Sequence, residues 1–195
     1  LLSGGSNIHL ATKAHLEKYS AYTTIACLDE RFSADPQLNN SLQLQSHNLN
    51  VVPFVPARNQ TLSQFAKQFS TFLNNWMIKN RNGTIIATIG MGDDGHIAGI
   101  SPFPNDPDAF SSIFLQTTNL AVGYTGNLQP PERITVTPNF LIDHLDYAVC
   151  YISGANKQSA FNKLFNDNHT LSQFPGKIIN QLTAQTHLFT DLKQP

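Results

Sequence analysis

A histidine lies in a glycine-rich turn near the middle of the chain. The segment Gly90-Met91-Gly92-Asp93-Asp94-Gly95-His96 follows an apolar run at 84–89, and its glycines let the backbone bend sharply and approach a ligand. A neutral imidazole accepts a proton from water near neutral pH, and a nearby carboxylate can hold its tautomer or stabilise the imidazolium. We therefore predict His96 as a general base with Asp94 as its partner. A structural histidine and a turn-forming aspartate are the alternatives.

Two further segments place polar groups where predicted strands end. Gly4-Gly5-Ser6 lies between an apolar strand end and a helix, so its backbone N–H groups can cradle a phosphate; a plain tight turn is the alternative. Asp29-Glu30-Arg31 follows the apolar run 25–28, at the carboxyl end of a predicted parallel strand, where open α/β sheets bind ligands. Taken alone, these three charges are more typical of a solvated loop than of a ligand site.

Two cations occupy comparable positions later in the chain. Arg133 follows Pro130-Pro131-Glu132 and opens a strand. Lys157 comes in the first turn of a predicted helix, after Ser153-Gly154. A cation at a helix N-terminus opposes the macrodipole, so Lys157 needs an anion or open solvent nearby.

The elements that must position these residues follow from the hydrophobic pattern. Short β-branched runs alternate with amphipathic segments, which predicts βα units with helices on both faces of a parallel sheet. We expect one three-layer α/β/α domain over residues 1–195, with a mainly parallel, Rossmann-like sheet. Because Leu1-Leu2 is typical of a strand end, we expect a segment N-terminal to it to be missing. The predicted strands are 23–28, 50–54, 84–89, 120–124, 134–136, 147–152 and 186–189, and the predicted helices are 8–19, 62–79 and 156–165.

Composition excludes several classes of partner. Charged residues make up 13% of the 195 residues and the formal net charge is −1, so we expect no nucleic-acid partner. No apolar stretch approaches the roughly 20 residues that span a bilayer, so we expect no membrane partner. Cys27 and Cys150 lie in apolar runs, which indicates free thiols in a cytoplasmic protein. His and Cys residues lack metal-ligand spacing, so we expect neither metal nor cofactor.

Five segments occur in the order seen in one enzyme family. They are Leu2-Ser3-Gly4-Gly5-Ser6, Asp29-Glu30-Arg31, Gly90 to His96, Pro131-Glu132-Arg133-Ile134-Thr135 and Ser153-Gly154-Ala155-Asn156-Lys157. With this order, the chain resembles the 6-phosphogluconolactonases from residue 1 to about residue 191. The resemblance implies the fold of the deaminase and ribose-5-phosphate isomerase superfamily. It also implies hydrolysis of a phosphosugar lactone, a small-molecule substrate of the pentose phosphate pathway.

The resemblance also implies roles for individual residues. His96 would activate water, while Arg31, Arg133 and Lys157 would anchor the substrate's phosphate. Gly4, Gly5 and Ser6 would supply backbone donors, and Asp29 would line the substrate site. Asn40 falls near an asparagine of the family and would lend its amide to the substrate; an exposed loop amide is the alternative. The sequence does not indicate an oligomeric state.

Two other functions remain open from the sequence. The related hexosamine-phosphate deaminases share the Asp-Gly-His turn, but they place a glutamate five residues after the histidine, where this chain has Ser101. A glucosamine-6-phosphate deaminase is therefore the second hypothesis, with Asp29 as its base. A non-catalytic sugar-phosphate-binding protein is the third, because Asn7-Ile8 and Gly99-Ile100-Ser101 depart from the lactonase pattern.

Overall fold

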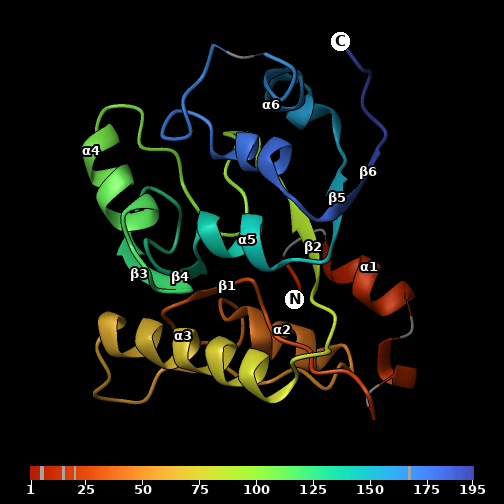
Figure 1. Cartoon of the computed structure of the whole chain (residues 1–195), viewed down its shortest axis with the longest axis vertical. Coiled ribbons are helices and arrows are strands. Elements are labelled where there is room, and N and C mark those ends of the chain that lie inside the picture. Colours follow the sequence, from red (N-terminus) through yellow and green to blue (C-terminus); the bar gives the residue numbers. More distant parts are fainter. Residues whose placement is uncertain (5–6, 15, 20, 167) are drawn as a thin grey trace.

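The computed structural model describes residues 1–4, 7–14, 16–19, 21–166 and 168–195. Helices and strands alternate along much of this length, and the strands form two separate sheets (Figure 1). The helices are α1 (Ile8–Lys13), α2 (Asn40–Ser46), α3 (Leu62–Lys79), α4 (Pro107–Phe110), α5 (Pro138–His144) and α6 (Gln158–Lys163). The strands are β1 (Asp29–Arg31), β2 (Ile86–Gly90), β3 (Ala121–Thr125), β4 (Glu132–Val136), β5 (Tyr147–Ile152) and β6 (Gln185–Thr190). Further helical turns cover Leu16–Tyr19, Ala155–Lys157 and Pro175–Gln181, which are 3₁₀, and Ser111–Leu115, which is a π-helix.

One sheet is parallel and has the strand order β2-β5-β6. Parallel bridges extend it beyond β2, because Leu2 pairs with both Thr88 and Cys27, and Ile25 pairs with Val51. Each of these outer segments makes isolated bridges rather than a continuous ladder. Their backbones therefore run with the sheet without forming full strands.

The other sheet is antiparallel and has the order β1-β4-β3. Helix α3 packs on β3 and β4, and in Figure 1 it runs beneath β1, β3 and β4. A side chain at Gly123 of β3 would lie 3.0 Å from Leu62 and 3.1 Å from Ala66 of the helix. Glycine at this position therefore permits the close approach of helix and sheet.

Helix α3 begins and ends where its sequence dictates. The Thr61 side chain accepts a hydrogen bond from the backbone N–H of Gln64, and the Gln64 side chain accepts one from the backbone N–H of Thr61, so together they form a capping box. Phe65, Phe69 and Leu73 recur on one face and are all buried. The Phe69 ring packs edge-on against Phe54, with ring centroids 4.8 Å apart.

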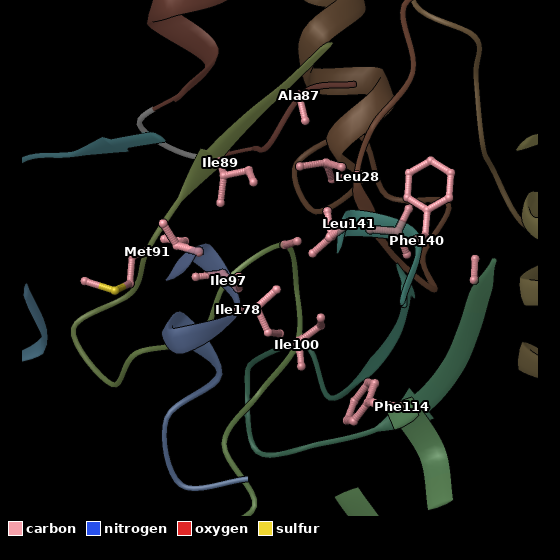
Figure 2. Packing of buried hydrophobic residues seen from close by; sticks show 14 of the residues in the cluster. Leu28, Ala87, Ile89, Met91, Ile97, Ile100, Phe114, Phe140, Leu141 and Ile178 are labelled. Carbon is pink, nitrogen blue, oxygen red and sulfur yellow. The ribbon is translucent and has the colours of Figure 1, made fainter. Parts of the chain in front are cut away.

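The main core lies between the two sheets and reaches into the loop that follows β2. Figure 2 shows Ile89 of β2, Leu28 from the start of the antiparallel sheet and Ile178 from the turn 175–181 converging on it. Ile97 and Ile100, both in the loop after β2, are fully buried in the same cluster. The loop after β2 is therefore packed into the core, as the strands are.

The predicted α/β class with a parallel sheet is confirmed, while the separate antiparallel sheet was not predicted. The predicted helix 62–79 agrees with α3 at both ends, and strand 147–152 agrees with β5. The predicted helix 8–19 is divided into α1 and a 3₁₀ turn. None of the described helices is long and apolar enough to cross a membrane.

The interpretation of 29–31 as a solvated loop is wrong. These residues form β1, which pairs antiparallel with β4, and Asp29 and Glu30 are 6% and 1% exposed. The charges tolerate burial because both carboxylates have polar partners within the fold.

The aromatic contact between α3 and Phe54 generates a stability prediction. Phe69→Ala should lower the free energy of unfolding by about 3–5 kcal/mol, because it removes a ring that is 1% exposed and leaves a cavity. Denaturant unfolding followed by circular dichroism measures the change. Phe72→Ala, on the same helix but only partly buried, is the matched control and should cost less. Equal losses for the two variants would contradict this assignment of the core.

Candidate active site

Four segments with polar residues leave the parallel sheet at one edge. Leu2 runs parallel to β2 and to the segment at Cys27, and β2 runs parallel to β5 with Gly90 opposite Tyr151. The carboxyl ends of these segments therefore lie together. The residues that follow them are Gly4, then 29–31, then the loop 91–96, and last the turn Ala155–Lys157.

His96 and Asp94 form a directly bonded pair. The imidazole Nδ1 lies 2.6 Å from Asp94 Oδ1, and the same oxygen accepts the His96 backbone N–H at 3.0 Å. Burial alone would raise the pKa of Asp94, but the hydrogen bonds from His96 outweigh it and lower that pKa. An ionised Asp94 favours the tautomer with the proton on Nδ1, which leaves Nε2 free to accept one. The imidazole side chain is 33% exposed, so water and substrate can reach it.

Two hydroxyl groups from the antiparallel sheet hold the loop beyond His96. Thr135 Oγ1 of β4 donates to the carbonyl of Ala98, and the Tyr124 hydroxyl of β3 donates to the carbonyl of Gly99. Ala98 and Gly99 have φ angles of 48° and 77°, in the left-handed region that disfavours alanine. The two hydrogen bonds and the buried isoleucines maintain this conformation, which fixes the direction in which the loop leaves His96.

Arg31 and Arg133 face each other across the antiparallel sheet. They are paired residues in the register of β1 with β4. Arg31 donates from one terminal nitrogen to the Leu38 carbonyl at 2.9 Å and also to Asn40 Oδ1, while its Nε is buried without a partner among the described residues. Like charges in directly opposed positions repel each other, so the pair favours an anion nearby.

Arg133 is the more buried member of the pair. It donates from Nε to the Pro130 carbonyl at 3.1 Å and from a terminal nitrogen to the Gln129 carbonyl at 3.0 Å. Its other terminal nitrogen lies 3.7 Å from Asp29 Oδ2. Burial lowers the pKa of Arg133, Asp29 raises it, and Arg31 lowers it further. Asp94 of the histidine loop also raises the pKa of Arg133, but more weakly than Asp29 does.

Asn40 is part of this cluster rather than an exposed loop amide. It is fully buried at the start of α2 and donates from Nδ2 to the Asp29 carbonyl at 2.9 Å. A side chain at Gly4 would collide with the Asn40 amide, which brings the first glycine turn against the same group. Gly5 and Ser6, which were predicted to supply backbone donors, lie outside the described residues.

Glu30 holds this cluster together and was not predicted as a site residue. Its Oε1 accepts the backbone N–H groups of Asn40 at 2.6 Å and Arg31 at 2.8 Å, and its Oε2 accepts that of Ser41 at 2.7 Å. Burial raises the pKa of Glu30 to about 7, although these three donors act in the opposite direction. Its position between Asp29 and Arg31 offers no sequence signal for this role, because two of its three partners, Asn40 and Ser41, are ten and eleven residues away.

Lys157 follows a strand of the parallel sheet, whereas the arginine pair lies in the antiparallel sheet. It ends the 3₁₀ turn after β5 and acts electrostatically on Asp191. The structure thus brings Gly4, Asn40, Asp29, Arg31 and Arg133 into one cluster, with the His96–Asp94 pair electrostatically linked to it. That Lys157 shares one cleft with them stays a prediction.

The described candidate residues at this edge form neither a metal cluster nor the lining of a large apolar cavity. Within the described part of the chain, no three His, Cys, Asp or Glu side chains are grouped to hold a metal ion. A cavity of about 850 Å³ is lined mainly by apolar residues of α1, α3 and β2, including Leu10, Phe72 and Ile86. No candidate site residue lines that cavity.

Comparison with known proteins identifies the family of the chain. Residues 1–188 match the model of the family described as glucosamine-6-phosphate isomerases/6-phosphogluconolactonase. The chain belongs to this family. Its members share the fold, and the two activities in the family's description correspond to the first two hypotheses from the sequence.

The individual proteins that the chain resembles share less than a third of their aligned residues with it. A probable 6-phosphogluconolactonase of Dictyostelium discoideum is 28% identical over 158 residues, which is 78% of this chain and 62% of that protein. The chain thus spans less than two thirds of that relative's length. A 6-phosphogluconolactonase structure from Shewanella baltica has a TM-score of 0.77 at 18% identity, covering 97% of this chain and 81% of that one. A monomeric glucosamine-6-phosphate deaminase has a TM-score of 0.68 at 18% identity, covering 98% and 84%. These two structures establish the fold.

The raised pKa of Glu30 generates a prediction about stability and pH. The native carboxyl holds its proton up to about pH 7, whereas its ordinary pKa is 4.5, so its contribution to stability is complete below 4.5 and is lost as the pH rises through 7. Glu30→Gln removes this titration. Between pH 4.5 and pH 8, the wild type should therefore lose about 3 kcal/mol of unfolding free energy relative to Glu30→Gln.

Denaturant unfolding at several pH values measures this difference. Glu132→Gln, at an exposed position in the neighbouring strand β4, is the matched control. A Glu30→Gln difference that stays flat across the range would contradict the proton-binding role of Glu30.

Proposed function

We propose that the protein hydrolyses 6-phosphoglucono-1,5-lactone to 6-phosphogluconate, a reaction of the pentose phosphate pathway. The main support is the His96–Asp94 pair, joined at 2.6 Å and electrostatically linked to the arginine pair. A base beside cationic groups suits a substrate that carries a reactive carbonyl at one end and a phosphate at the other. Membership of the family and the name of the Dictyostelium relative support the same reaction.

The proposed chemistry is general-base hydrolysis by His96. Nε2 takes a proton from water, and the water oxygen bonds to the lactone carbonyl carbon. The bond between that carbon and the ring oxygen then breaks, and the imidazolium returns the proton to the leaving ring oxygen. Asp94 stabilises the imidazolium between these two proton transfers. The route needs only protein side chains and water.

The proposed role of the cations is to fix the phosphate. Arg31, Arg133 and Lys157 would bind it, with backbone donors from the turn at Gly4, Gly5 and Ser6. Because the phosphate is remote from the carbonyl, its binding energy serves to position the lactone for attack. Asn40 would hold Arg31 in place by accepting a hydrogen bond, and Asp29 would hold Arg133 through its charge. Residues 1–195 would then form one catalytic domain with this single site.

The deaminase hypothesis has less support in the geometry. Ser101, at the position where the deaminases carry a glutamate, is fully buried and donates its N–H to the Tyr124 hydroxyl at 3.1 Å. Asp29, the alternative base, is buried and lies 3.7 Å from Arg133, so its carboxylate already has a structural partner within the fold. A non-catalytic sugar-phosphate-binding protein is distinguished by binding 6-phosphogluconate without hydrolysing the lactone.

His96→Ala should lower kcat for 6-phosphogluconolactone by about 10²–10⁴-fold, the usual contribution of a positioned general base. KM should change little, since the cations remain in place. A coupled assay with 6-phosphogluconate dehydrogenase measures the rate, after subtraction of spontaneous lactone opening. His47→Ala, at an exposed histidine after α2, is the matched control. A His96→Ala variant with the full enzyme-dependent rate would transfer the role of base to Asp94 or Asp29.

Arg133→Ala should raise KM for the phosphorylated lactone by about tenfold or more, because it removes a charge-assisted contact present before and during reaction. It should affect unphosphorylated glucono-1,5-lactone much less. Steady-state kinetics with both lactones measure this discrimination. Arg58→Ala, at an exposed arginine, is the control.

Because Arg133 is buried beside Asp29, the folding of the variant needs its own check. Arg133→Lys keeps the positive charge and should retain part of the discrimination, while circular dichroism reports whether each variant is folded. Equal loss of activity on both lactones by a folded Arg133→Ala variant would show that Arg133 does not recognise the phosphate.

A further inference from the structure

The segment after β6 binds back to the loop that carries Lys157. The Asp191 carboxylate accepts the Ser153 hydroxyl at 2.9 Å and the Gly154 backbone N–H at 3.0 Å. Both partners lie between the end of β5 and the 3₁₀ turn that ends at Lys157. Asp191, which lies 38 residues after Ser153 in the sequence, therefore fixes the backbone that leads to Lys157.

A second contact holds the other side of Lys157. The Gln158 side chain donates to the Lys193 carbonyl at 2.8 Å and accepts the Lys193 backbone N–H at 3.1 Å. Such a two-way pair fixes both the distance and the orientation of the segments that it joins. Residues 191–193, here called the C-terminal clasp, thus bond to the chain on both sides of Lys157.

The loop needs an external support of this kind. Gly154 has φ of 106°, in a region open to glycine, and glycine leaves the backbone free in the absence of contacts. Lysine has a long, flexible side chain, so the position of its ammonium depends on a well-placed backbone. The hydrogen bonds from Gly154 and Ser153 lower the pKa of Asp191, and Lys157 acts in the same direction.

We propose that the C-terminal clasp positions Lys157 for the phosphate of the substrate, with Asp191 as the principal positioning residue. The inference rests on the proposed role of Lys157 as a phosphate anchor. The clasp lies beyond residues 1–188, the part of the chain that matches the family.

A simpler role for Asp191 predicts the opposite effect. If Asp191 acted only as a counter-charge to Lys157, its removal would free the ammonium and strengthen phosphate binding. If Asp191 acts through the clasp, its removal loosens the loop and weakens phosphate binding. The sign of the change therefore separates the two roles.

The test compares Asp191→Ala with Asp191→Asn. Alanine removes both hydrogen bonds, whereas asparagine can still accept the Gly154 N–H and can donate to the Ser153 hydroxyl while lacking the charge. Asp191→Ala should raise KM for 6-phosphogluconolactone and the calorimetric Kd for 6-phosphogluconate by roughly three- to tenfold, with kcat little changed. Asp191→Asn should remain near wild type. Asp143→Ala, at an exposed aspartate of α5, is the matched control.

A double-mutant cycle with Lys157→Met shows whether the effect passes through Lys157. In that background Asp191→Ala should cause no further change in the Kd for 6-phosphogluconate. Gln158→Ala, which breaks the other half of the clasp, should weaken binding in the wild-type background in the same direction. These binding measurements need no turnover, so they judge the clasp even if the protein does not hydrolyse the lactone.

Several outcomes would overturn the clasp. An unchanged or tighter Kd in Asp191→Ala would do so, as would an Asp191→Ala effect that persists in the Lys157→Met background. Normal hydrolysis by Asp191→Ala with an unchanged KM would leave the proposed function intact and exclude the clasp. Failure of the wild type to bind 6-phosphogluconate would overturn both proposals.

Discussion

Two arginines directly opposed on neighbouring strands are the electrostatic constraint on which the candidate site depends. The register of β1 with β4 places Arg31 opposite Arg133, and their repulsion has to be offset by the fold. Asp29 offsets part of it from 3.7 Å, and the Asn40 amide accepts from Arg31. These partners fix the guanidinium groups within the fold itself, so the positive centre is preformed.

The position of that centre relative to the histidine depends on contacts between the two sheets. The Thr135 hydroxyl of β4 and the Tyr124 hydroxyl of β3 donate hydrogen bonds to the carbonyls of Ala98 and Gly99. These two residues follow His96 by two and three positions. The strand that supplies Arg133 therefore also supports the histidine loop through Thr135. Displacement of β4 would move the histidine loop and Arg133 together, which preserves their relative geometry; the proposed hydrolysis would depend on that geometry.

The three cations proposed as anchors differ in how they are held. The arginines are fixed by buried partners close to the core, while Lys157 is partly buried in a turn that is bonded from residues near the end of the chain. Buried groups give up little mobility when a ligand binds, whereas a lysine on a short turn depends on the contacts of the surrounding backbone. The site thus combines a rigid part in the antiparallel sheet with a part that is stabilised locally.

The sequence by itself determined the parallel sheet, α3 and the edge at which polar residues gather. The phenylalanine spacing and Thr61 define α3, and glycine-rich loops after apolar runs indicate where His96 and Gly4 lie. Only the tertiary structure decided that 29–31 pair antiparallel with β4, that Glu30 is buried among backbone N–H groups, and that Asp191 reaches Gly154. Helical periodicity and strand-to-loop transitions are local and visible within a few residues. The pairing partner of a three-residue strand and the partners of a buried carboxylate depend on segments ten to a hundred residues away, which only the folded chain brings together.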